Sequence, residues 1–174
     1  AYAEHLNWEV AVKPLGLTDG LGVKVYGDQL ENDEEVKNYI SYILDQGYSG
    51  HKAVLVEEKL RGEEFSLQCL VHDELVIPTP AVQDFKKLLP GDRGLNTASM
   101  GSCSAERRLL PFMEEYDYTN ALDCVQTTLK AFKNKTGKIC TGFLYGQFMA
   151  VQEGIKLIEY NYRPGDPEWM NTMT

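Results

Sequence analysis

The segment from Leu157 to Glu168 constrains this chain most, because an apolar strand in it carries polar side chains and then stops at a Pro-Gly turn. Side chains two residues apart along a strand point to the same face, so Glu159, Asn161 and Arg163 are predicted to lie together. A carboxylate and an amide oxygen are hard ligands suited to Mg²⁺, and an arginine beside them binds phosphate oxygens. The pattern is typical of a phosphoryl-transfer site. An edge strand with its polar face in water is the simpler interpretation, and other segments decide between the two.

The composition limits the class of protein. A chain of 174 residues, 43% hydrophobic and 25% charged, indicates one globular domain or two small lobes. The 17 basic and 26 acidic residues give a formal charge of −9, and the basic residues are scattered, which argues against nucleic acid as a partner. No apolar run approaches the ~18 residues of a membrane span and no charged-then-apolar leader opens the chain, so we expect a cytoplasmic protein without membrane contact. The four cysteines form no C-x-x-C pair, which predicts reduced thiols rather than a zinc site.

Apolar periodicity predicts alternating strands and helices with no linker between them. A glycine-rich loop over 14–22 joins strands at 8–13 and 23–26 as a hairpin, and a helix over 33–46 ends at Gly47. A second helix carries Leu122, Val125, Leu129 and Phe132 on one face. The remaining predicted strands lie at 53–56, 65–72, 75–77, 143–151 and 155–160. A polar turn at 73–74 and a second at 152–154 each join two of them.

Four segments, in this order and spanning nearly the whole chain, carry a family resemblance. They are 13–23 (KPLGLTDGLGV), 57–66 (EEKLRGEEFS), 83–87 with 91–101 (QDFKK and GDRGLNTASMG), and the strand segment that ends in RPGDPE. Together they resemble the ATP-grasp domain of the phosphoribosylamine-glycine ligases. The resemblance implies an α+β fold of the ATP-grasp class, in which two α+β lobes bind a nucleotide between them. It divides the chain into a small lobe, 1–60, with the phosphate loop, and a larger lobe, 61–174, with the metal site. It also implies N-terminal and C-terminal family domains that are absent from this chain.

Lys13 and the glycines after it have a physical interpretation of their own. Lys13 ends a predicted strand where the glycine-rich loop begins, so its ammonium group can bind a phosphate as a point charge. Gly20 and Gly22 allow backbone N–H groups to approach phosphate oxygens. In the family that the chain resembles, the corresponding lysine and loop cover the phosphates of ATP. A solvated lysine beside an ordinary hairpin turn is the alternative.

The second segment supplies candidate contacts to the nucleoside. At 57–60 a predicted strand leads into a segment whose backbone N–H and C=O groups match the edge of adenine. The resemblance assigns Glu57, Lys59 and Leu60 to adenine, and Glu64 to the ribose hydroxyls. A solvent-facing acidic pair is the competing interpretation of Glu63 and Glu64.

The third segment and the last turn supply candidates for the other substrates. Asp84 and Asp166 are candidates for an amino-acid pocket, and Lys86 and Lys87 for a phosphorylated substrate. A charged surface loop is the alternative interpretation of residues 84–87.

The resemblance implies ATP-dependent ligation of glycine to 5-phosphoribosylamine, which gives glycinamide ribonucleotide, ADP and phosphate through glycyl phosphate, a step of purine biosynthesis. Glu159 and Asn161 would hold Mg²⁺ or Mn²⁺ between the phosphates, and the metal would neutralise charge during transfer. Lys13, Arg163 and Asp166 are the residues expected closest to the reaction. Placement and electrostatic stabilisation would supply most of the rate.

The chain departs from the family pattern at several positions. Leu21 stands where a lysine is usual between the last two loop glycines, which predicts weaker phosphate binding. A third acidic metal ligand is common one strand earlier, and the hairpin register brings Gln147 to that position, where its amide oxygen would be a neutral ligand. The other departures are Phe85 for histidine, Leu95 for proline, and Ala98 and Ser99 for two glycines. We therefore expect retained nucleotide chemistry with an altered acceptor loop, the segment 85–99 that contains these last four departures.

Two alternatives stay open from the sequence. The chain is an ATP-grasp ligase for a different carboxylate and amine, or a nucleotide-binding module whose catalysis is weakened by the departures at Leu21, Phe85, Ala98 and Ser99. For a fragment, ATP binding without turnover is a further expected outcome, because parts of the phosphoribosylamine pocket would lie outside it.

Overall fold

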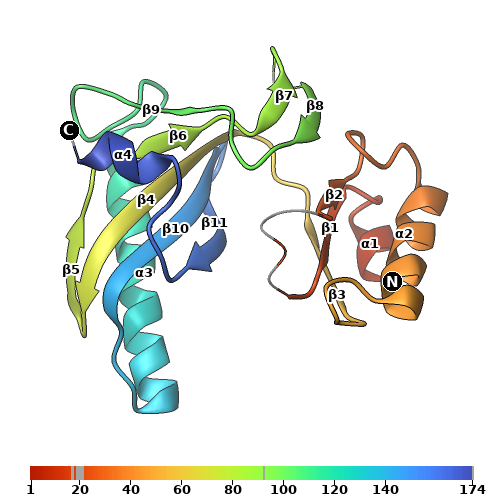
Figure 1. The fold of residues 1–174 in the computed structure, drawn as a ribbon, viewed down its shortest axis with the longest axis horizontal. Helices are drawn as coiled ribbons and strands as arrows, with labels where there is room; N and C mark the ends of the chain where they lie inside the picture. Colours follow the sequence, from red (N-terminus) through yellow and green to blue (C-terminus); the bar gives the residue numbers. More distant parts are fainter. Residues whose placement is uncertain (17, 19–21, 92, 174) are drawn as a thin grey trace. The chain divides into compact units, whose positions relative to one another are not determined.

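A computed structural model describes residues 1–16, 18, 22–91 and 93–173 of the chain (Figure 1). Two compact units, Ala1–Leu60 and Arg61–Thr174, account for its internal contacts, and each has a hydrophobic core of its own.

The first unit is a three-stranded antiparallel sheet with one long helix. Its elements are α1 (Tyr2–His5), β1 (Val10–Pro14), β2 (Lys24–Val25), α2 (Asp33–Gln46) and β3 (Val54–Glu58). The strand order is β2-β1-β3, with Ala11 opposite Val25 and Val12 opposite Val56. The hairpin predicted around the glycine-rich loop is therefore confirmed, and it places Lys13 on the central strand.

The sequence signals at the ends of α2 explain its limits. The side chain of Asn32 accepts a hydrogen bond from the backbone N–H of Glu35 at 3.0 Å, which satisfies a donor that the first turn leaves unpaired. Gly47 ends the helix with φ 79°, a conformation that favours glycine. Val36 and Ile43 lie on one helical face and are fully buried against the strands. The helix predicted over 33–46 is confirmed.

The second unit is built on a six-stranded antiparallel sheet. Its strands are β4 (Glu63–His72), β5 (Leu75–Pro78), β6 (Val82–Asp84), β9 (Ser102–Ser104), β10 (Thr141–Val151) and β11 (Gly154–Asn161). The order is β11-β10-β4-β6-β9, and β5 pairs with β4 along the same edge as β6. A separate two-stranded ribbon consists of β7 (Lys87–Leu89) and β8 (Arg93–Asn96).

One face of this sheet is the hydrophobic core. Phe65, Leu67 and Cys69 alternate along β4 and are almost fully buried under the helix α3 (Glu115–Thr136). The rings of Phe65 and Phe148 stack at 5.5 Å between centroids. Figure 1 shows α3 behind the sheet and the short helix α4 (Glu168–Thr172) in front of it. Val125 and Leu129 of the predicted second helix are buried in this core and Leu122 packs against it, as the periodicity indicated, but Phe132 of the same predicted face is 39% exposed.

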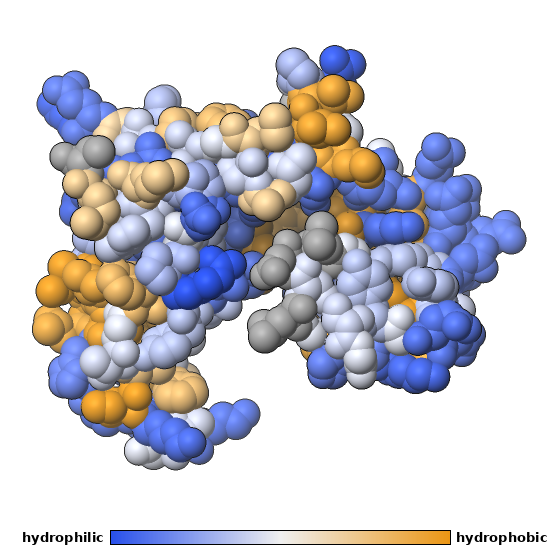
Figure 2. Space-filling model, in the orientation of Figure 1, coloured by the Kyte–Doolittle hydropathy of each residue, from blue (hydrophilic) through white to orange (hydrophobic). Residues whose placement is uncertain are grey.

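The segment between β5 and α3 departs most from the sequence analysis, which assigned no strands there. It contains β6 to β9, held by short ladders such as Asp84 opposite Ser102. The β7–β8 ribbon exposes Leu88, Leu89 and Leu95 at half or more of their surface, and Figure 2 shows hydrophobic atoms gathered over it. Strands of three or four residues are too short for alternation to reveal them.

Among the described residues, none of the helices has the length and apolar character needed to cross a bilayer.

Candidate functional site

The sheet face opposite α3 carries polar side chains, many of them buried. Ser66 and Gln68 alternate with the core residues of β4 and are each 2% exposed. Tyr145 and Gln147 stand on the neighbouring strand, directly opposite Gln68 and Ser66 in the register. Burying a polar side chain costs free energy unless the side chain has a hydrogen-bond partner. The side chains of this face are therefore expected to form an ordered hydrogen-bond network.

Glu159 and Asn161 lie on β11, the strand at one edge of this sheet. The Asn161 amide donates to the Glu159 carboxylate at 2.9 Å, and both groups are accessible to solvent. The register places Gln147 directly opposite Glu159, as the sequence analysis expected for that hairpin. The strand ends at Asn161, so Arg163 lies beyond it, where its guanidinium donates to the carbonyl of Pro164 at 3.0 Å.

Glu64 connects the sheet face to the third segment. Its carboxylate accepts from the Gln147 amide at 2.7 Å and from the ammonium of Lys86 at 3.2 Å. The Lys86 ammonium also lies 4.0 Å from Asp84. Four of the predicted site residues, Glu64, Lys86, Asp84 and Gln147, are therefore in one polar cluster.

Asp84 is buried beside the acceptor loop, with its side chain 6% exposed. The Ser99 hydroxyl donates to it at 2.6 Å and accepts from the backbone N–H of Gly101 at 3.0 Å. Burial raises the pKa of the Asp84 carboxyl, and the hydrogen bond from Ser99 offsets part of that rise. Neither Ala98 nor Ser99 has a positive φ, so the loop follows a path that these side chains tolerate.

A shallow hollow of about 300 Å³ lies next to this loop. Its lining consists of Ala98, Ser99, Gly101, Asp166 and Pro167. The hollow therefore brings Asp166, one of the two carboxylates predicted for the amino-acid pocket, beside Ser99, which binds the other.

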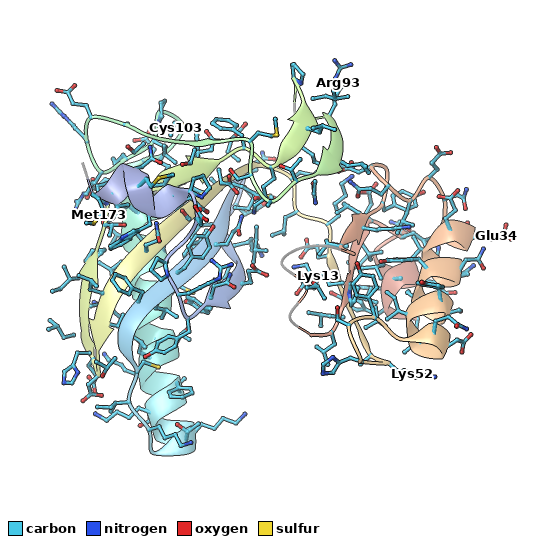
Figure 3. All side chains as sticks on the ribbon, in the orientation of Figure 1. Lys13, Glu34, Lys52, Arg93, Cys103 and Met173 are labelled. Atoms are coloured by element: carbon cyan, nitrogen blue, oxygen red, sulfur yellow. The ribbon has the colours of Figure 1, made fainter. Side chains whose placement is uncertain are left out.

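In the first unit, Lys13 projects from β1 (Figure 3). Its ammonium group forms an ion pair with Glu57 on β3. The Lys59 ammonium donates to the carbonyl of Tyr26 and lies 3.4 Å from Asp28, which ties the end of β3 to the turn after β2. Leu60 is the last residue of this unit.

Gly22 has φ +84°, and a Cβ there would lie 2.5 Å from the ring of Tyr48, so glycine is required at this position. Gly20 and Leu21 lie outside the described residues.

The metal-binding residues proposed from the sequence form a small donor set. No cluster of three or more His, Cys, Asp and Glu side chains suited to a metal ion occurs among the described residues. Glu159 and Asn161 nevertheless fit Mg²⁺, which takes oxygen ligands, uses one or two carboxylates and keeps waters and phosphate oxygens as its other ligands. The Gln147 amide nitrogen donates to Glu64 at 2.7 Å and its oxygen lies 3.3 Å from the Tyr145 hydroxyl, so its part in the metal site stays a prediction.

Sequence reasoning did not identify several polar residues of this region. They are Gln68, Ser99, Tyr145 and Glu168. A signal existed for two of them, because Gln68 and Tyr145 each interrupt an otherwise apolar strand at a position that alternates with core residues.

Comparison with known proteins decides the family. The family model described as phosphoribosylglycinamide synthetase, ATP-grasp (A) domain, matches residues 1–169. The chain belongs to this family. Its similarity to the phosphoribosylamine-glycine ligases, predicted from four segments, is therefore confirmed.

Curated relatives of this ATP-grasp domain agree with the family match. The phosphoribosylamine-glycine ligase of Methanopyrus kandleri is 46% identical over 172 residues, which are 99% of this chain and 38% of that protein. The ligase of Methanocaldococcus jannaschii is 48% identical over 165 residues, or 95% of this chain and 37% of that protein. The chain thus spans less than two fifths of the length of these relatives.

Solved structures confirm the α+β ATP-grasp fold. A phosphoribosylamine-glycine ligase from Thermotoga maritima superposes with a TM-score of 0.74 at 29% identity, covering 95% of this chain and 42% of that one. A biotin carboxylase from Campylobacter jejuni, in a structure described as a beta-gamma-ATP complex, gives a TM-score of 0.64 at 15% identity, covering 98% of this chain and 35% of that one. The second likeness concerns the fold alone.

Proposed function

We propose that this ATP-grasp domain binds ATP with Mg²⁺ and serves the ligation of glycine to 5-phosphoribosylamine. The family match over residues 1–169 carries the proposal. The polar sheet face supports it. On one side of one sheet, Glu159 and Asn161 supply hard oxygen ligands. Glu64 supplies a carboxylate for hydroxyl groups, and Lys86 supplies a cation.

In the proposed reaction the glycine carboxylate attacks the γ-phosphate of ATP, which releases ADP and gives glycyl phosphate. The amine of 5-phosphoribosylamine then attacks the acyl carbon and phosphate leaves, so glycinamide ribonucleotide forms. Mg²⁺ held by Glu159 and Asn161 would neutralise charge on the phosphates.

The residues of this chain bind and orient the reactants in this proposal. Lys13 and the loop with Gly20 and Gly22 bind phosphate oxygens, and Arg163 binds the transferred group.

The nucleoside and the other substrates are assigned to separate groups. Adenine contacts come from Glu57, Lys59 and Leu60, and Glu64 accepts from the ribose hydroxyls. Asp84 and Asp166 accept from the glycine ammonium group. Lys86 and Lys87 bind the phosphate of phosphoribosylamine. Oriented binding of this kind lowers the entropic part of the barrier.

The test is release of ADP by the full-length protein that carries this sequence. We expect release to require Mg²⁺, glycine and 5-phosphoribosylamine together, with alanine as the matched amino-acid control. Release that proceeds equally with another carboxylate, or without any amino acid, would contradict the substrate assignment. ATP binding without release under all these conditions would favour a nucleotide-binding module instead.

A further inference from the structure

A buried tyrosine and a buried carboxylate meet beneath the turn that carries Arg163 and Asp166. Tyr145 is 4% exposed and Glu168 is 3% exposed. The Tyr145 hydroxyl donates to the Glu168 carboxylate at 2.7 Å. Burial and the adjacent Glu168 charge raise the pKa of Tyr145, so the hydroxyl keeps its proton and remains a donor.

Glu168 and Tyr145 together fix the backbone of this turn. Gly165 is buried, and its N–H donates to Gln68 at 2.7 Å. A Cβ at Gly165 would lie 2.7 Å from both a Glu168 carboxylate oxygen and the Tyr145 ring, so the turn rests directly on the pair. The position of Asp166, the next residue, therefore depends on this contact.

The Tyr145 hydroxyl also makes a longer and weaker contact with Gln147, the residue that donates to Glu64. Tyr145 lies 3.3 Å from the side-chain oxygen of Gln147, whose amide nitrogen donates to Glu64 at 2.7 Å. A phenol has one hydrogen to donate, and a carboxylate is the stronger acceptor, so the bond to Glu168 dominates. The position of Glu64 thus depends less on Tyr145 than the position of the turn does.

We propose that Tyr145 is a positioning residue for the ligation, acting through Glu168 on the turn that holds Asp166. This inference rests on the proposed function, because it assigns Tyr145 to the placement of glycine. The hydroxyl itself contacts protein groups, and its role is to keep the turn in one position while the acceptor side of the site is occupied.

Tyr145→Phe in the full-length protein tests this role, because it removes the hydroxyl and keeps the ring. We expect kcat/KM for glycine to fall about tenfold, and KM for MgATP to change less than threefold, because the weaker contact serves Glu64. A fall in kcat/KM for glycine of less than twofold would overturn the inference. An equal change in both parameters would also overturn it.

Tyr118→Phe is the matched control. Tyr118 is also buried at 3% exposure and donates one hydrogen bond, to the carbonyl of Thr79 at 2.8 Å, but this bond belongs to the α3 side of the sheet. We expect Tyr118→Phe to lower the unfolding temperature as Tyr145→Phe does, with unchanged kinetics for glycine.

The double variant Tyr145→Phe/Glu168→Leu separates positioning from stability. It removes both members of the pair, so the buried carboxylate is no longer left without its donor and the unfolding temperature should rise above that of Tyr145→Phe. The kinetic defect with glycine should remain. Recovery of glycine kinetics together with stability would show a merely structural role and overturn the inference.

Trp169 gives a readout that is independent of the reaction. Its ring packs edge-on against Phe143 at 4.7 Å between centroids, one residue after Glu168. In this 174-residue chain with Trp8→Phe, which leaves Trp169 as its one tryptophan, Tyr145→Phe should increase acrylamide quenching, because α4 and the turn lose their anchor. Absence of glycine-dependent ADP release in the parent protein would contradict the proposed function. Unchanged quenching in Tyr145→Phe would overturn the positioning inference, whatever the result for ADP release.

Discussion

Gly62 is the position where a single methyl group should do most damage to the sheet that carries the site. A Cβ built there lies 1.9 Å from the carbonyl oxygen of Ala150 and 2.8 Å from its carbon. Carbon–oxygen contacts need about 3.3 Å, and both atoms belong to the backbone, so β4 and β10 must separate locally. The pairing of Glu63 with Ala150, and of Glu64 with Met149, would be disturbed.

Gly62→Ala should therefore cost about 3 kcal/mol, from about 1–3 kcal/mol of overpacking and about 1 kcal/mol for each lost ladder hydrogen bond. For a chain of 174 residues this corresponds to about 6–12 °C in Tm. The assay is thermal and urea unfolding followed by circular dichroism. ATP affinity should fall as well, because Glu64 follows two residues later.

Gly50→Ala serves as the comparison for this prediction. Gly50 has φ +81° and no neighbouring atom within 4 Å of a built Cβ, so alanine there meets only the cost of a left-handed backbone, about 1–2 kcal/mol. If Gly62→Ala loses no more stability than Gly50→Ala, the collision with Ala150 is not a real constraint and the reasoning is refuted.

Three further predictions concern charge and reactivity. Glu159→Gln should abolish Mg²⁺-dependent turnover, whereas Glu153→Gln on the adjacent turn should leave it unchanged; equal rates for the two variants would contradict the metal assignment. The raised pKa of Asp84 means that the folded chain binds this proton more tightly than the unfolded chain, so its contribution to stability is present below about pH 4 and is lost as pH rises through the folded-state pKa. Asp84→Asn keeps an acceptor for Ser99 and should be more stable than the parent at pH 7 but not at pH 3.5 in urea unfolding; the opposite pH dependence would show that the sign is wrong. Burial raises the pKa of Cys69 to about 12, so in thiol titration of the folded chain it should react last of the four cysteines, and early labelling of Cys69 would contradict its burial.

The sequence predicted the elements whose periodicity is long enough to be read. The helix over 33–46 has a capping asparagine, two buried apolar positions and a terminal glycine, and the structure has it with the same limits. The long strands β4 and β10 were also predicted, because alternation persists over eight or more residues. The three hairpins β1–β2, β4–β5 and β10–β11 were predicted from the turns between their strands.

The short strands of the acceptor segment were not predicted, because three or four residues give no period. Their positions follow from tertiary pairing, for example Asp84 with Ser102. Similarly, β11 ends at Asn161, so the alternation that was extended to Arg163 stops before it.

The charged residues of the candidate site could be predicted from the sequence motifs. Its buried polar residues could not. Glu64, Lys86 and Asp84 were named from the sequence and lie in one cluster. In the sequence, Glu168 is the last residue of the RPGDPE segment. In the structure its side chain is buried and accepts a hydrogen bond from Tyr145. Only the pairing of strands and the return of α4 onto the sheet bring these two residues together, and neither leaves a local signal in the sequence.

Thermal unfolding of this chain with ATP, in the presence and absence of Mg²⁺, tests the central claim most directly. A ligand at ~100 times its dissociation constant stabilises the folded state by about 2.7 kcal/mol, which is about 5–11 °C in Tm for a chain of this size. We predict a shift of this size with MgATP, a smaller one with ATP alone, and loss of the Mg²⁺-dependent part in Glu159→Gln. No shift with MgATP at any concentration would contradict the proposal that this domain binds the nucleotide.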